Sequence, residues 1–188
     1  GGAMSRGFGE YLRSWWQRPF DFDWTARHFR ATGAVRVHQV SIGGLSLIYG
    51  FTALLVVWWS QTDTTAVTWR LPVLVIAASS IIAGLRWMFG RWPTERESLA
   101  FAIYADVSVF VAVWCCADAF TAMPGLALLA ANGIYVVVFH GPRVLLTHLL
   151  FAAAAFAWIA GLAVEQGTAP GVVIAIRVLV LFPAVMGS

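Results

Sequence analysis

Two charged residues inside long apolar stretches are the first candidates for chemistry in this chain. Asp106 falls in one stretch and Arg177 in another. A charge inside a bilayer costs free energy, so it usually has a partner and often a function. Helical geometry places the two at levels that differ by ~5–10 Å, which a long arginine side chain can bridge. We predict that Asp106 and Arg177 organise the core as a buried pair. The alternatives are Arg177 turned outward to Glu165 or Asp118, and a proton relay.

Hydroxyl and amide side chains on the apolar stretches form a second candidate site. They can line a polar pocket between helices for an unknown small ligand, although the sequence does not show that they face one another. The residues are Tyr104, Ser108, Asn132, Ser79 and Ser80.

The sequence contains no recognisable catalytic motif. HExxH, GxSxG, P-loop and GxGxxG patterns are all absent, so we expect no catalysis by this chain. A haem held by two transmembrane histidines needs both at similar depth. His140 and His148 instead flank a connection, while His28 and His38 precede the apolar stretches. We therefore predict no metal and no cofactor, and a haem-binding membrane subunit is kept as an alternative.

The elements that must position these side chains are six apolar stretches, each near the ~20 residues that cross a bilayer as a helix. They lie at 40–60, 71–89, 98–117, 123–140, 143–163 and 170–188. Only 11% of the residues are charged, against about 25% in a soluble domain. Lipid cannot satisfy free backbone groups, so the spans must be helical. The predicted fold class is all-α, a polytopic membrane protein with six transmembrane helices.

The arginines orient these spans. Ten of the twelve precede the first span or fall on the second and fourth connections, while Arg70 lies on the opposite side. The ten are Arg6, Arg13, Arg18, Arg27, Arg30, Arg36, Arg86, Arg91, Arg96 and Arg143. The positive-inside rule then predicts a multi-pass protein of the plasma membrane with both termini cytoplasmic. This topology also explains the net charge of +3 without nucleic acid as a partner.

The segment before the first span has its own organisation. Residues 1–3 are expected to be the remnant of a cleaved tag, residues 4–39 a cytoplasmic amphipathic segment, and residues 40–188 the transmembrane domain. Apolar side chains recur at helical spacing from Phe8 to Trp16, which predicts a helix in the membrane interface. Its expected anchors, with one from the following helix, are Trp15, Trp16 and Trp24. Contact with a cytoplasmic partner is the alternative to anchoring.

Short signals predict helix ends and helix contacts. Asp23 is expected to cap a short helix over 24–32 that Gly33 ends. Thr94 and Glu97 have the spacing of a capping box, and Pro142 suits a first helical turn. Glycines at 84, 125 and 133 are predicted points of close helix approach. A row of small residues predicts helix packing, within the bundle or between protomers. This row is Ala153, Ala157 and Gly161.

One connection carries a family resemblance. The stretch 132–148, and most specifically Phe139-His140-Gly141-Pro142-Arg143, resembles part of the membrane region that precedes the GGDEF domain in actinobacterial diguanylate cyclases. Weaker similarity covers 105–106 and 177–181. The resemblance implies a sensory and dimerising input domain, with His140 and Arg143 in a cytoplasmic loop that senses or transmits its state. No GGDEF sequence is present, so we expect the natural C-terminal domain to have been removed.

We therefore expect a homodimeric regulatory input domain of a bacterial signalling protein. It would control cyclic di-GMP synthesis by its own C-terminal cytoplasmic domain, through a shift of the last span. Its partners are the lipid bilayer, a second copy, that domain and an unknown small ligand. A small transporter or channel is the first alternative, favoured by the polar residues inside the spans. A structural anchor without a sensing role is another.

Overall fold

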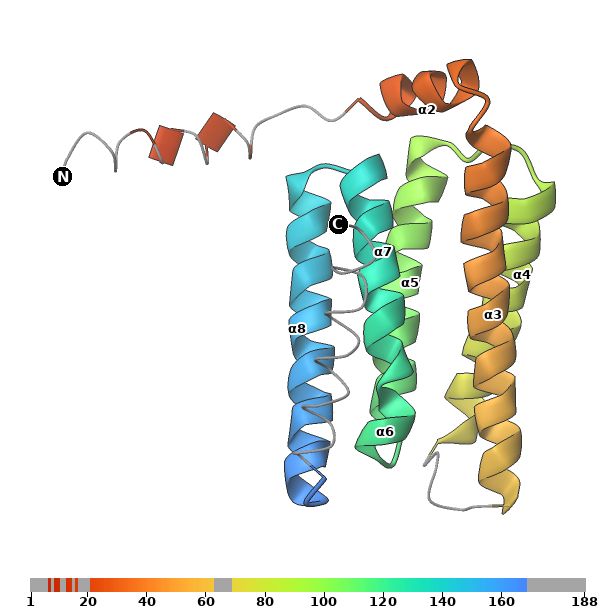
Figure 1. The fold of residues 1–188 in the computed structure, drawn as a ribbon, viewed down its shortest axis with the longest axis vertical. Coiled ribbons are helices and arrows are strands. Elements are labelled where there is room, and N and C mark those ends of the chain that lie inside the picture. Colours follow the sequence, from red (N-terminus) through yellow and green to blue (C-terminus); the bar gives the residue numbers. More distant parts are fainter. Residues whose placement is uncertain are drawn as a thin grey trace.

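The chain folds into a bundle of antiparallel helices with one short helix across its end (Figure 1). The computed structural model describes residues 21–62 and 69–168, with six isolated positions between 7 and 16. Its elements are α2 (Phe22–Ala31), α3 (Val35–Thr62), α4 (Arg70–Phe89), α5 (Glu95–Cys115), the single turn α6 (Ala119–Ala122), α7 (Pro124–Phe139) and α8 (Pro142–Glu165). No β-strand occurs in these described ranges, so the all-α prediction is confirmed.

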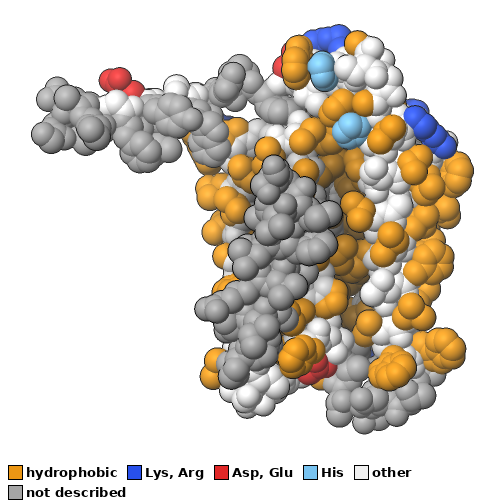
Figure 2. Space-filling view, in the orientation of Figure 1, with side chains coloured by type: hydrophobic (Ala, Val, Ile, Leu, Met, Phe, Trp, Pro, Cys, Tyr) orange, Lys and Arg blue, Asp and Glu red, His pale blue; other side chains and the backbone are white. Residues whose placement is uncertain are grey.

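Five stretches in the described ranges are long and apolar enough to cross a membrane. They are Val35–Trp59, Arg70–Phe89, Glu95–Cys115, Ala119–Phe139 and Pro142–Glu165, and they coincide with the first five predicted spans. The predicted sixth span, 170–188, lies outside the described residues. Large apolar side chains such as Ile48, Leu71 and Phe89 are exposed on the helices, and such side chains are spread over the visible face in Figure 2. This surface suits contact with lipid.

The two ends of the bundle differ in charge. One end carries α2, the α4–α5 connection and the α7–α8 connection, and we call it the arginine-rich end. Figure 2 shows arginine side chains at this end, near α2. Within residues 21–62 and 69–168, its arginines are Arg27, Arg30, Arg36, Arg86, Arg91, Arg96 and Arg143.

Local signals set most of the helix ends as predicted. Thr94 and Glu97 form the capping box at the start of α5, Pro142 lies in the first turn of α8, and Gly33 follows α2 with a positive φ of 71°. The predicted cap at Asp23 is wrong. Asp21 caps α2 instead, because its side chain accepts a hydrogen bond of 2.8 Å from the backbone N–H of Trp24. Phe22 is already helical, so Asp23 falls in the first turn, where a negative charge favours the helix dipole.

Helices α3 and α4 pack backbone to backbone through glycine. A Cβ atom on Gly43 would lie 2.7 Å from the carbonyl oxygen of Gly84, and one on Gly84 would lie 2.8 Å from that of Gly43. Gly50 repeats the pattern, because its Cβ would lie 2.8 Å from the carbonyl oxygen of Ala77. Small residues allow this approach where lipid provides no hydrophobic drive for association. The close approach predicted at Gly84 is confirmed.

The second half of the bundle packs around α5. Its buried core includes Val109 and Val113 on α5, Leu129 on α7, and Ala155 and Ile159 on α8. The predicted row of Ala153, Ala157 and Gly161 lies on another face of α8 and is exposed among the described residues. A Cβ atom on Gly161 would meet nothing within 4 Å. Packing by this row therefore stays a prediction.

Candidate functional site

A buried carboxylate in α5 connects three helices. Asp106 is 3% exposed. Its Oδ1 accepts a hydrogen bond of 2.7 Å from Nδ2 of Asn132 on α7. The same oxygen lies 2.8 Å from Nδ1 of His148 on α8, and the side chains of Asp106 and His148 are each 5% exposed. Both contacts fall on the same atom, so one oxygen joins α5, α7 and α8. We call these three residues the Asp106 cluster.

The partners of Asp106 are themselves fixed. The amide of Asn132 also donates to the carbonyl oxygen of Ala102, one turn before Asp106, at 3.1 Å. The imidazole of His148 lies against the bare backbone of α7, since a Cβ atom on Gly133 would lie 2.8 Å from Nε2. The close approach predicted at Gly133 is therefore confirmed. Any side chain at this position would force His148 or α7 to shift.

A crevice leads from the arginine-rich end to the Asp106 cluster. It has a volume of about 150 Å³ and runs between α5 and α8, lined by Leu99, Asp106, Arg143 and Thr147 among others. Leu99 and Arg143 belong to the first turns of their helices, whereas Asp106 lies ~17 Å along α5 from Glu95 at 1.5 Å per residue. Both hydrogen bonds of Asp106 use Oδ1, and Oδ2 accepts none from the described residues. The crevice therefore reaches the side chain that carries this second oxygen.

The N-terminal segment reaches the mouth of this crevice. The guanidinium carbon of Arg143 lies 5.7 Å from the centre of the Trp16 ring, which is a cation–π contact. Trp16 is helical and exposed. The predicted anchor Trp24 on α2 is 59% exposed and stacks on His28. The third anchor, Trp15, and Arg177 lie outside the described residues, so a contact between Asp106 and Arg177 stays a prediction.

The residues predicted to line a polar pocket gather around one cavity. It has a volume of about 90 Å³ and is lined by Ser80, Tyr104, Ser108 and Asn132, together with Tyr49 and Tyr135. Ser79 contacts the site indirectly, because its Oγ lies 2.6 Å from the hydroxyl of Tyr104.

The hydroxyl groups of this cavity already have protein partners. Tyr104 also pairs with Ser80 at 2.9 Å, and the hydroxyl of Tyr49 donates to the carbonyl oxygen of Ser108 at 3.1 Å. A partnered hydroxyl gains little from a new ligand group. The geometry therefore favours a small, mainly apolar ligand over a polar one.

His140, predicted in a loop, is buried at the arginine-rich end. It is 7% exposed, because Phe22 of α2 stacks on its ring with centroids 6.4 Å apart. Its Nε2 lies 3.0 Å from Oγ of Ser98, which also pairs with the hydroxyl of Tyr135. Burial disfavours the charged imidazole and lowers the pKa of His140. Docking of α2 contributes to this burial and so to the lower pKa of His140.

We expect acid to loosen this end of the protein through His140. A folded-state pKa below the ordinary value of about 6.5 means that the unfolded chain binds the proton more tightly. Stability is then unaffected above about pH 6.5 and falls as the pH drops from there through the lower folded-state pKa. Thermal unfolding between pH 8 and pH 5 measures this effect. The unfolding temperature of a His140→Gln variant should depend less on pH. An equal pH dependence of the unfolding temperature in the two proteins would contradict the assignment of this effect to His140.

The described residues contain no group of three or more His, Cys, Asp or Glu side chains that could hold a metal ion. Asp106 and His148 form a pair without a third ligand of that kind. What the Asp106 cluster does in the structure is link three helices through one buried polar group, so a change in its hydrogen bonds acts on all three. Comparison with models of protein families, with curated proteins and with solved structures finds no match to this chain.

Proposed function

We propose that this chain is a membrane input domain that regulates a catalytic domain of a bacterial signalling protein. The observation that carries the proposal is the Asp106 cluster, in which one oxygen atom joins α5, α7 and α8. A polar network in an apolar interior is stable when every member is paired and costly when one is not. Protonating Asp106 or displacing His148 therefore favours a different packing of these helices, and such a two-state change is what a signal requires.

The stimulus enters from the arginine-rich end. The crevice between α5 and α8 joins Arg143 to Asp106, so a proton from that side has access to the carboxylate. Trp16, in contact with Arg143, is placed to sense or limit this access. In this proposal the N-terminal segment is an interfacial helix, and its position changes with the state of the crevice.

The output is cyclic di-GMP synthesis by a domain that follows the last span. Support comes from the resemblance of the stretch around His140 and Arg143 to the membrane regions of diguanylate cyclases. Such enzymes need two catalytic domains face to face, so a homodimer with six spans per protomer and cytoplasmic termini converts a helix shift into activity. The exposed row of Ala153, Ala157 and Gly161 on α8 is available for contact with a second copy or with the sixth span.

A chimera tests this function. Residues 4–188 are joined to a diguanylate cyclase domain, and cyclic di-GMP synthesis is measured in isolated membranes. The Asp106→Asn substitution should change the rate by about fivefold or more, the usual lower range of coupling between sites. The matched control is Val107→Ala, which alters the neighbouring, lipid-exposed side chain. Equal rates for the wild-type, Asp106→Asn and unrelated-anchor chimeras would overturn the proposal in favour of a plain anchor.

A proton-coupled transporter is the second candidate. The carboxylate–histidine pair at the inner end of a crevice is an arrangement that proton-driven transport also uses. Proton flux into liposomes containing only this chain, lost in Asp106→Asn, would favour transport. The haem alternative gains no support, because His148 is held between Asp106 and Gly133 while Phe22 covers His140.

A further inference from the structure

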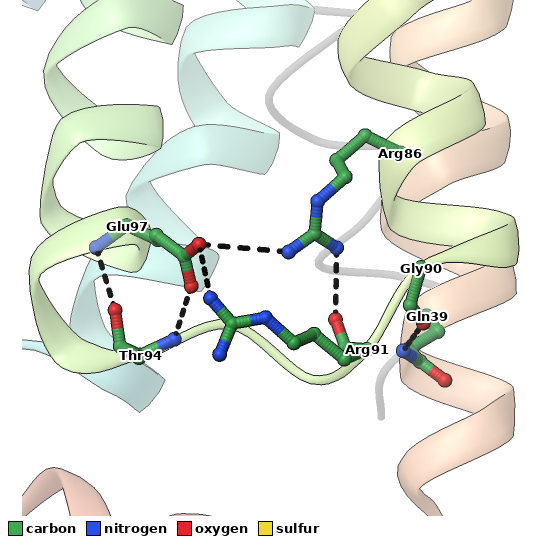
Figure 3. Close-up of polar contacts among 6 residues, drawn as sticks. All are labelled: Gln39, Arg86, Gly90, Arg91, Thr94 and Glu97. Atoms are coloured by element: carbon green, nitrogen blue, oxygen red, sulfur yellow. Dashed lines mark hydrogen bonds and ion pairs between the residues drawn. The ribbon is translucent and has the colours of Figure 1, made fainter.

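A crevice between α4 and α5 is lined by Arg86 and Glu97, and Arg91 of the connection is paired with that same Glu97. Figure 3 shows Arg86 from the last turn of α4 and Arg91 from the connection, both directed at Glu97 of α5. The crevice has a volume of about 140 Å³, and its walls include Ala83, Trp87 and Phe101. It therefore combines a charged rim with an aromatic and aliphatic interior.

Glu97 brings the two guanidinium groups together. Its Oε1 lies 2.9 Å from Nη2 of Arg91 and 3.6 Å from Nη2 of Arg86. Its Oε2 accepts a hydrogen bond of 2.7 Å from the backbone N–H of Thr94, so the helix cap fixes the carboxylate. The two cations consequently lie on either side of one oxygen atom, in a position that the α5 capping box determines.

The backbone around the arginines is equally constrained. Nη1 of Arg86 donates to the carbonyl oxygen of Arg91 at 2.9 Å. The guanidinium passes so close to Gly90 that a Cβ atom there would lie 2.1 Å from Nη1. From α3, the side chain of Gln39 donates to the carbonyl oxygen of Gly90 at 3.1 Å. These contacts within the protein therefore hold the arginine side chains in the arrangement of Figure 3, so a ligand does not have to order them when it binds.

Charge and exposure leave the arginines able to bind an anion. Two guanidinium groups and one carboxylate give this rim a net charge of +1. The side chains of Arg86 and Arg91 are 43% and 68% exposed, and each guanidinium has five N–H donors, most of which Glu97 and the backbone do not use. Arginine forks match the oxygen atoms of a phosphate. The rim is therefore suited to a phosphate monoanion.

The surroundings indicate that this phosphate belongs to a lipid. The rim lies at the end of two candidate spans, where head groups meet the hydrocarbon region. Just before Arg86 on α4, Ile82 is 67% exposed and Leu85 is 45% exposed, and Phe89 beyond it is 73% exposed. An acyl chain can follow this surface and the apolar crevice, whereas a soluble phosphate would gain nothing from either.

We propose that this crevice is a binding site for an anionic phospholipid, with its phosphate on the N–H groups of Arg86 and Arg91 that Glu97 and the backbone leave unused, and an acyl chain against α4 and Phe101. The preference for an anionic lipid follows from the net charge of the rim, because a zwitterionic head group would bring its own cation beside two arginines. Basic pockets between transmembrane helices bind anionic head groups in this way.

Lipid-dependent stability of the purified chain tests the proposal. Short-chain phosphatidylglycerol or phosphatidylcholine is titrated into the protein in detergent, and thermal unfolding is followed by tryptophan fluorescence. Phosphatidylglycerol should stabilise the protein at lower concentrations than phosphatidylcholine. Arg86→Gln and Arg91→Gln should each raise the half-maximal concentration by about fivefold. Because Arg91 is in the connection and largely exposed, its variant remains informative if Arg86→Gln does not fold.

The matched control is Arg96→Gln, which removes the same charge from the exposed first turn of α5 and should retain wild-type lipid dependence. Equal stabilisation by both lipids would overturn the proposal. If Arg96→Gln weakened the response to phosphatidylglycerol as much as Arg86→Gln and Arg91→Gln do, binding would depend on general surface charge and not on a defined site. Equal stabilisation by glycerol phosphate would assign the site to a soluble phosphate compound and would also overturn the lipid proposal.

Discussion

Replacing Asp106 with alanine should lower the unfolding temperature of this protein in detergent by about 6–12 °C. The substitution removes the oxygen that joins Asn132 and His148 and leaves both side chains buried without this acceptor. Interhelical hydrogen bonds alone contribute roughly 0.6 kcal/mol each in membrane proteins. The buried side chains of Asn132 and His148 would also lose this acceptor, which raises the cost. We therefore expect the free energy of unfolding to fall by about 3 kcal/mol, near the lower limit for breaking a buried pair.

Two variants distinguish the free-energy cost of the lost hydrogen bonds from the cost of the lost side-chain volume. Asp106→Asn keeps the shape and one acceptor oxygen, so it should cost only about 1–2 kcal/mol. Val107→Ala removes a partly lipid-exposed side chain from the next position and should shift unfolding little. If Asp106→Ala unfolds at the same temperature as Val107→Ala, the Asp106 cluster does not hold the three helices together.

The positions of the helices could be predicted from the sequence because one physical constraint dominates. A segment that crosses lipid must be apolar, helical and ~20 residues long, and all three properties are visible in the residues. The capping box at Thr94 and the proline at 142 could also be predicted from the sequence, because each acts within one helical turn. The cap of α2 was placed two residues late because Phe22 is buried against the bundle, a tertiary contact that extends the helix backward.

The partner of Asp106 was not predicted, although a signal was available. In the sequence His148 only flanks a connection, and it lies six residues from the start of α8. At 1.5 Å per residue this is ~9 Å inside the helix, close to the depth of Asn132 counted from the end of α7. Polar residues that share a depth on adjacent spans are candidates to pair. Adjacency itself cannot be derived from one sequence, because it depends on which faces the helices turn to one another.

The cavity lined by Tyr104 and Asn132 is a second case in which the sequence alone could not show which side chains contact one another. Tyr104, Ser108, Asn132, Ser79 and Ser80 were chosen for their polarity, and the structure places them together. Polarity did not reveal that their hydroxyls bond to one another and to backbone carbonyls, for example Tyr49 to Ser108. Nor did it reveal that α2 covers His140, since the aromatic contact with Phe22 joins residues far apart in the chain.

Two consecutive glycines on α3 should respond in opposite ways to the same substitution. A Cβ atom on Gly43 would lie 2.4 Å from Cγ of Met88 and 2.7 Å from the carbonyl oxygen of Gly84, whereas one on Gly44 would meet nothing within 4 Å. The methionine side chain can move, but the backbone carbonyl cannot. Gly43→Ala must therefore separate α3 from α4, at a cost of about 1–3 kcal/mol for overpacking. Gly44→Ala should gain up to about 1 kcal/mol from helix propensity.

The difference between these two variants isolates the helix contact, because both change glycine to alanine in one helix at adjacent positions. We expect their unfolding temperatures in detergent to differ by about 2–16 °C, with Gly43→Ala the lower. Equal temperatures would mean that α3 and α4 are not held backbone to backbone. Under the proposed regulatory function, a rigid α3–α4 pair would confine a helix shift to the place where that pair meets α5 and α7. That junction contains the cavity lined by Tyr104 and Asn132, so the amide that binds Asp106 also borders the junction.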